Sequence, residues 1–154
     1  MPSGIFPSSN LPSPLSPQLQ TCVSWLEAIT TADFDSLERL VTDDYTHTFL
    51  PPELNSTKLI GKKMFLEFFR GELKDFASFG MTINEVEETP GEVVWQLSSD
   101  TMTTGGYHYT NEYTVVISVS KQVDGTHQVA GVRETFKHPE LLAALQRAIA
   151  GQKV

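Results

Sequence analysis

Alternating polar and apolar positions run from Tyr107 to Val119, and this pattern predicts one long strand. β-branched and aromatic residues fill the stretch, and neither proline nor glycine interrupts it. Because successive side chains of a strand point to opposite faces, the stretch presents two different surfaces. One surface is apolar toward its C-terminal end and carries phenols and an amide toward its start: Tyr107, Tyr109, Asn111, Tyr113, Val115, Ile117 and Val119. This surface is typical of a strand that floors a core along one half and a pocket along the other.

Apolar residues at helical spacing predict four helices. The first begins at Ser16-Pro17, because serine caps helices and proline fits their first position. Asp33 can cap a shorter second helix, and the last helix begins at His138-Pro139-Glu140. The third, from residue 62 to about residue 76, has a thick apolar side that contains four phenylalanines: Phe65, Phe68, Phe69 and Phe76.

A period of two residues predicts the remaining strands, at residues 45–50, about 79–88, about 92–103 and about 127–136. Helices come early and a meander comes late, so the order predicts an α+β fold. We expect a strongly curved antiparallel sheet wrapped on three helices to form a cone-shaped cavity, with the C-terminal helix in addition. Residues 1–17 contain five prolines and five serines, which predicts a disordered tail before a single domain at 18–154.

Composition narrows the classes of function. The net charge of -8 argues against nucleic acid or an anionic membrane as the partner. The single cysteine, Cys22, cannot form an internal disulfide, and this fits a reducing compartment. No apolar run reaches the roughly 18 residues that span a bilayer, and the N-terminus lacks the features of a secretory signal. We therefore expect a cytoplasmic protein.

Two titratable side chains on the predicted inner faces are candidates for proton transfer. His47 lies mid-strand between Tyr45 and Phe49, and histidine titrates near neutral pH. Glu134 shares a strand face with Val132 and Phe136, and a carboxyl in apolar surroundings suits proton abstraction beside a carbonyl. The alternatives are structural: a core histidine bonded to a backbone carbonyl or to Glu134, and a carboxylate paired with a cation from the third helix.

A third group combines an amide with phenols on the long strand. Asn111, Tyr109 and Tyr113 can donate hydrogen bonds to a carbonyl that becomes an enolate, or can simply pack across strands. Glu112 falls on the opposite face unless a bulge reverses it, and only one of Asp100 and Trp95 can face inward. The expected pocket lining also includes Tyr45, Trp25, Phe65, Phe69, Trp95 and Met102.

Motifs that bind cofactors or metals are missing from the sequence. The four histidines are scattered, no cysteine pair is present, and Gly105-Gly106 makes a turn rather than a phosphate-binding loop. We therefore expect no cofactor and no metal. Cys22 lies on an apolar helix stripe, which indicates an inert core thiol.

Five short motifs, in this order and spacing, resemble one known family: residues 32–37, residues 40–45, Ile60-Gly61-Lys62, Asn111-Glu112-Tyr113 and residues 132–136. Over about residues 18–138 the chain resembles the nuclear-transport-factor-like (cystatin-like) α+β fold and, within it, the SnoaL-like polyketide cyclases and isomerases. The Asn-Glu-Tyr strand is most similar to small isomerases of fungal meroterpenoid and polyketide pathways. Many relatives carry an aspartate after the last strand, where this chain has Lys137 or His138.

The resemblance implies a cofactor-free enzyme of secondary metabolism. It would isomerise, cyclise or dehydrate a polyketide- or terpenoid-derived carbonyl compound, with His47 and Glu134 moving a proton while Asn111 and a tyrosine stabilise the oxyanion. The fold also hosts modules that bind hydrophobic small molecules without reaction, and dimerisation domains, so these remain alternatives. We expect a homodimer through the outer sheet face, which is flat and weakly charged: Thr110, Thr114, Val116 and Ser118.

Overall fold

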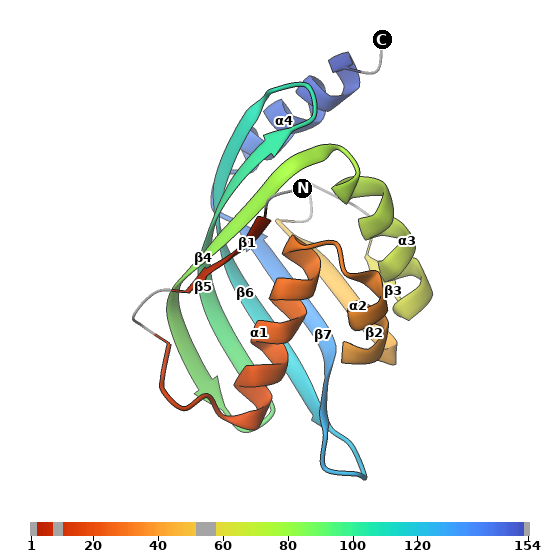
Figure 1. Ribbon diagram of the computed structural model, residues 1–154, viewed down its shortest axis with the longest axis vertical. Helices are drawn as coiled ribbons and strands as arrows, with labels where there is room; N and C mark the ends of the chain where they lie inside the picture. Colours follow the sequence, from red (N-terminus) through yellow and green to blue (C-terminus); the bar gives the residue numbers. More distant parts are fainter. Residues whose placement is uncertain (1–2, 8–10, 52–57, 153–154) are drawn as a thin grey trace.

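The computed structural model describes residues 3–7, 11–51 and 58–152. These residues form four helices and seven strands in the predicted α+β order (Figure 1). The elements are β1 (Ser3–Pro7), α1 (Pro17–Thr30), α2 (Phe34–Leu40), β2 (Val41–Leu50), β3 (Leu59–Ile60), α3 (Lys62–Leu73), β4 (Phe76–Thr89), β5 (Glu92–Thr103), β6 (His108–Lys121), β7 (His127–Phe136) and α4 (Pro139–Gln152).

One sheet contains all the strands, in the order β1-β4-β5-β6-β7-β2-β3. Strands β4 to β7 form the predicted antiparallel meander, whereas β2 lies parallel to β7 and β1 lies parallel to β4. Figure 1 shows a curved sheet with α1 and α2 against one face, α3 beside them, and α4 near the β5–β6 turn. The predicted wrapping of a curved sheet around helices is therefore confirmed.

Local capping explains where the first two helices begin. The Ser16 hydroxyl accepts a hydrogen bond from the Leu19 backbone N–H at 3.1 Å, and Pro17 occupies the first helical position. The Asp33 carboxylate accepts from the Ser36 backbone N–H at 3.1 Å, as the sequence predicted. The apolar side of α1 then packs into the core, and Cys22 is fully buried there. Burial raises the pKa of the Cys22 thiol to about 12, so the thiol stays protonated and inert at neutral pH.

The strand faces follow the predicted alternation along β6, where Tyr109, Asn111 and Tyr113 are buried and His108, Thr110 and Glu112 are exposed. On β7 the alternation shifts at a bulge opposite Ser118 and Val119. The core therefore receives Val129 rather than Ala130, which strict alternation from Val132 would place on that face.

Several element boundaries differ from the sequence pattern because pairing extends or shortens the elements. Strand β2 begins at Val41, four residues before the predicted start, and α3 ends at Leu73, so that Phe76 opens β4. Within the segment expected to be a disordered tail, residues 3–7 form β1 on the edge of β4, while residues 1–2 and 8–10 lie outside the described residues. Across the described chain, no helix is both long and apolar enough to cross a membrane.

Candidate active site

The candidate site is a cavity of about 120 Å³ at the end of the sheet that α4 approaches. Phenylalanines from β2, α3, β4 and β7 make most of its wall, and Leu142 and Leu145 of α4 complete it. Its polar lining residues are Glu72, Thr101, Tyr109, Tyr113, Glu134 and Gln146. A second, smaller apolar chamber of about 70 Å³ lies under α1, lined by Trp25 among others. Glu134 and Tyr113 line both chambers, so both polar groups lie where the two spaces meet.

The Glu134 carboxylate is the partly exposed end of a chain of hydrogen bonds that is otherwise buried. Its Oε1 lies 3.2 Å from His47 Nε2, and His47 Nδ1 lies 2.7 Å from the Tyr45 hydroxyl. Between an ionised carboxylate and a neutral imidazole, Nε2 donates to Glu134 and Nδ1 accepts from the Tyr45 hydroxyl. The Glu134 side chain is 20% exposed, whereas the His47 side chain is fully buried. Only the carboxylate can therefore meet a ligand directly.

The parallel pairing of β2 with β7 brings these residues together. Phe49 is opposite Glu134 and His47 is opposite Val132, so His47 and Glu134 are diagonal neighbours on the inner face. Aromatic rings enclose the imidazole: Phe49 lies 4.6 Å and Phe69 5.6 Å from its ring centroid, and Phe65 and Trp25 stack at 6.1 and 6.4 Å. The partner of Glu134 is thus His47 rather than a cation of α3.

The phenols of β6, the strand next to β7, form a second polar group of the cavity. The Tyr113 hydroxyl lies 2.8 Å from Ser99 Oγ and 3.3 Å from the Tyr109 hydroxyl, and Asn111 Nδ2 donates to Tyr109 at 2.8 Å. Burial raises the pKa of Tyr113 well above its ordinary value and also raises the pKa of Tyr109, with the Glu134 charge adding to both effects. Both phenols therefore stay protonated at neutral pH and can donate hydrogen bonds.

These raised pKa values predict a fall in stability at alkaline pH. In the unfolded chain the phenols ionise near the ordinary value of 10.0, whereas burial keeps Tyr45, Tyr109 and Tyr113 protonated to higher pH in the folded chain. Their contribution is complete below pH about 10 and is lost as the pH rises toward the raised folded values. Urea unfolding between pH 8 and 11 should show this fall. Ionisation of Tyr113 near pH 10 in protein that is still folded, assigned with Tyr113→Phe, would contradict it.

The remaining predicted site residues divide into three groups. Trp25 and Phe69 line a chamber, as expected. Tyr45, Phe65 and Trp95 are inward but completely buried, and they line neither chamber because other side chains cover them. Met102 was expected in the pocket lining but does not lie there. It shares the outer face of β5 with Asp100, because its neighbours Thr101 and Thr103 take the inward positions.

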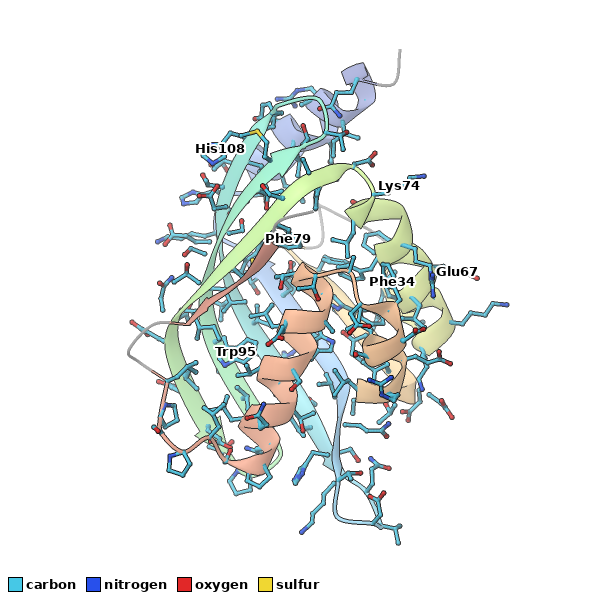
Figure 2. The ribbon with its side chains drawn as sticks, in the orientation of Figure 1. Phe34, Glu67, Lys74, Phe79, Trp95 and His108 are labelled. Carbon is cyan, nitrogen blue, oxygen red and sulfur yellow. The ribbon has the colours of Figure 1, made fainter. Side chains whose placement is uncertain are left out.

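The two further acidic residues considered for the cavity, Asp100 and Glu112, also lie on the outer face of the sheet. Asp100 binds His108 at 2.6 Å, and Figure 2 shows His108 at the edge of the molecule near the β5–β6 turn. Glu112 lies 3.3 Å from His138 and 3.5 Å from Lys137, and these neighbours hold the pKa of its carboxyl below the ordinary value. Neither carboxylate serves the cavity.

Asn111 faces inward as predicted but does not line the cavity. Its Nδ2 donates to the His138 backbone carbonyl at 3.0 Å, and its Oδ1 accepts from the His138 backbone N–H at 3.1 Å. The amide thus fixes the start of α4. Helix α4 closes the cavity with Leu142, Leu145 and Gln146, which was not expected from the sequence, although the apolar stripe of this helix was the available signal. Among the described residues, no group of side chains is suited to hold a metal ion.

Comparisons with known proteins agree with this architecture. The BvnE pinacolase from Penicillium brevicompactum is 20% identical with a TM-score of 0.73, and the match covers 92% of this chain and 98% of that one. PrhC from Penicillium brasilianum NBRC 6234 is 18% identical with a TM-score of 0.72, covering 88% and 89%. An LEH-like epoxide hydrolase from M. tuberculosis is 15% identical with a TM-score of 0.67, covering 88% and 93%.

At such low identities these likenesses show the fold alone. No functionally curated protein matches the sequence. The family is shown instead by residues 23–138, which match the SnoaL-like domain over well more than half of the chain. The chain therefore belongs to the SnoaL-like domain family.

Proposed function

We propose that this protein is a cofactor-free acid–base enzyme that moves a proton on a small, uncharged carbonyl compound. The observation that carries the proposal is the position of Glu134. Its carboxylate lies where two apolar chambers meet, and it is hydrogen-bonded to the buried imidazole of His47. A carboxylate in an apolar, preorganised pocket is the group that proton abstraction next to a carbonyl requires.

The chemistry balances within the cavity. Glu134 takes a proton from the carbon beside the carbonyl, the C–H electron pair forms a C=C bond, and the carbonyl oxygen becomes an enolate oxygen. A phenol of the cavity donates a hydrogen bond to that oxygen. Protonated Glu134 then returns the proton to another carbon, which isomerises the substrate, or to a departing β-hydroxyl group, which dehydrates it. Attack of the enolate carbon on a second carbonyl of the same molecule would cyclise it, and protonated Glu134 would give its proton to the alkoxide that forms.

Size and charge restrict the substrate. Glu134 and Glu72 are the charged side chains that line the larger chamber, and no lysine or arginine belongs to the described lining of either chamber. A carboxylate, phosphate or other anion would meet the like charge of Glu134 there, with no lysine or arginine in the described lining. The larger chamber is similar in size to a cavity that holds one benzene ring, roughly 150 Å³. The proposed substrate is therefore a neutral, compact carbonyl compound of polyketide or terpenoid origin.

A second candidate function is binding without reaction. The mutual hydrogen bond of His47 and Glu134 favours it, because the pair also satisfies two buried polar groups structurally. Solved structures of the same fold are named as a pinacolase and an epoxide hydrolase, so the fold can host catalysis and is compatible with the enzyme.

Dehydration of 3-hydroxycyclohexanone tests the proposal, because the cyclohexenone product absorbs in the ultraviolet. We expect the protein to accelerate this reaction and Glu134→Gln to abolish the acceleration. A ring of the same size that bears a carboxylate should not react. Saturable binding of the neutral ring without any product would support the binding module, and neither binding nor product would leave only a dimerisation domain.

We also propose that the protein is a homodimer through the outer sheet face. Thr110 and Ser118 are exposed there, and Thr114 and Val116 are half-buried. Gel filtration at micromolar concentration should give a mass near twice 17.1 kDa. Thr110→Lys with Thr114→Lys should produce monomers because like charges would meet across the two-fold axis. A wild-type protein that elutes at 17.1 kDa would contradict the dimer.

A further inference from the structure

The hydrogen bonds around Asn111 have only one consistent set of directions. A backbone N–H can only donate and a backbone carbonyl can only accept, and the His138 backbone offers one of each to the Asn111 amide. The carbonyl oxygen of the amide must therefore face the His138 N–H, and its nitrogen must face the His138 carbonyl. A flipped amide would lose both bonds. Asn111 Nδ2 then has one hydrogen left, and it donates this hydrogen to Tyr109.

The phenol network consequently has one hydrogen more than it uses. Ser99, Tyr113 and Tyr109 each bring one hydroxyl hydrogen, and Asn111 brings one amide hydrogen. These four hydrogens serve three contacts: Ser99 with Tyr113, Tyr113 with Tyr109, and Asn111 with Tyr109. Tyr113 donates its one hydroxyl hydrogen to Tyr109, so Ser99 must be the donor in its contact with Tyr113. The Tyr109 oxygen then accepts from both Tyr113 and Asn111, and the hydroxyl hydrogen of Tyr109 is the surplus one. Tyr109 lines the larger chamber with Glu134.

We propose that Tyr109 is the residue that donates to the enolate oxygen, and that Asn111 is a positioning residue which directs this hydrogen into the cavity while it holds helix α4 against the cavity. This inference rests on the proposed function and names the donor within it. It also narrows the roles expected from the sequence, in which Asn111, Tyr109 and Tyr113 were all possible donors and Asn111 with a tyrosine stabilised the oxyanion.

Charge transfer during the reaction favours this donor. The Glu134 charge is one of the factors that raise the pKa of Tyr109, and the bonds from Tyr113 and Asn111 lower it. When Glu134 takes up a proton, its charge disappears and the phenol becomes a stronger hydrogen-bond donor. At that moment the negative charge appears on the substrate oxygen, which is where stronger donation lowers the barrier.

The same amide links the donor to the wall of the cavity. Asn111 makes two hydrogen bonds to the backbone of His138, the residue just before α4. At the other end of the helix, Thr103 Oγ1 donates to Gln152 Oε1 at 2.6 Å. Displacement of the start of α4 would free the amide to rotate and would remove the constraint on Tyr109. The donor is therefore set only while α4 closes the cavity with Leu142 and Leu145.

Binding of 4-nitrophenol tests the donor, because the absorbance of this probe reports whether its oxygen is ionised. The experiment uses Glu134→Gln protein, in which a neutral amide replaces the carboxylate and mimics its protonated form. Adding Tyr109→Phe should weaken binding of the ionised probe by about 10–100-fold, the size expected for a hydrogen bond to a charged group. Nitrobenzene lacks the phenolic oxygen of the probe. Its affinities for the two proteins should differ by no more than about twofold if only the hydrogen bond from Tyr109 is lost.

Matched variants show which groups donate and which accept in the hydrogen bonds around Tyr109. Tyr113→Phe should weaken the ionised probe by less than Tyr109→Phe, because Asn111 still donates to Tyr109. Asn111→Asp should lower the ionised fraction of bound probe, because a carboxylate accepts the Tyr109 hydrogen instead of directing it outward, while loss of the bond to the His138 carbonyl should weaken both ligands alike. Loss of α4 packing alone would weaken both ligands equally. If Asn111→Asp does not fold, the comparison of Tyr109→Phe with Tyr113→Phe still decides.

Three results would overturn the inference, and they separate it from the proposed function. Unchanged probe binding in Tyr109→Phe, or a larger loss in Tyr113→Phe, would remove Tyr109 as the donor while leaving the role of Glu134 intact. An Asn111→Asp protein that ionises bound probe as the parent does would remove the positioning role. Failure of the parent protein to bind either ligand would overturn both the donor and the proposed site.

Discussion

Replacing Glu134 with glutamine is expected to lower kcat of the proposed reaction by about 10²–10⁴-fold, the usual contribution of a general acid or base. Glutamine keeps the shape of the side chain and can still bond to His47, but it cannot accept a proton from carbon. KM should change little because an uncharged substrate makes no ionic contact with the carboxylate. Initial rates with 3-hydroxycyclohexanone check this, and circular dichroism verifies that the variant folds.

His47 gives the matched comparison, because it reaches the cavity only through Glu134. His47→Ala should lower kcat by about 10²-fold, the scale of a misplaced catalytic group. The double variant should be no slower than Glu134→Gln alone, because one side chain works through the other. Additive losses in the double variant would show that His47 acts on the substrate by a separate route. Full activity in both single variants would remove the two residues from the mechanism.

Replacing Trp95 with alanine is expected to lower the free energy of unfolding by about 3–5 kcal/mol, as for other large buried aromatic side chains. Trp95 is completely buried and lines neither chamber, so its contribution is packing rather than substrate contact. Trp95→Phe should keep most of the stability and all of the catalytic rate. Urea unfolding measures the first effect and kcat the second.

Val123→Ala is the surface control for Trp95, since Val123 is fully exposed and should change stability by no more than about 0.5 kcal/mol. A stable Trp95→Ala protein with strongly raised KM would instead identify Trp95 as a substrate platform.

The fold and the polar pair were within reach of the sequence because they depend on periodicity. Alternation alone placed Tyr109, Asn111 and Tyr113 on the inner face of β6, and placed His47 and Glu134 on inner faces of β2 and β7. Order and spacing of the elements predicted the curved sheet. The bulge opposite Ser118 was not predicted, although Gly131 beside it was an available signal, because a glycine inside a strand pattern can mark a bulge.

The boundary between core and cavity could not be read from alternation. Tyr45, Trp95 and Tyr109 all point inward, yet only Tyr109 lines a chamber. The difference depends on where α1, α3 and α4 pack over the sheet, which is a property of tertiary packing. The role of Asn111 was hidden for the same reason, since α4 returns to β6 only in three dimensions.

Exchange of the α-hydrogens of cyclohexanone for deuterium, followed by NMR in D₂O, tests the account most directly. It measures proton abstraction itself, and it requires no knowledge of the natural substrate. We predict exchange well above the buffer rate with the wild-type protein, and exchange at the buffer rate with Glu134→Gln. Equal exchange rates in the two proteins would contradict the claim that a carboxylate between two apolar chambers abstracts the proton.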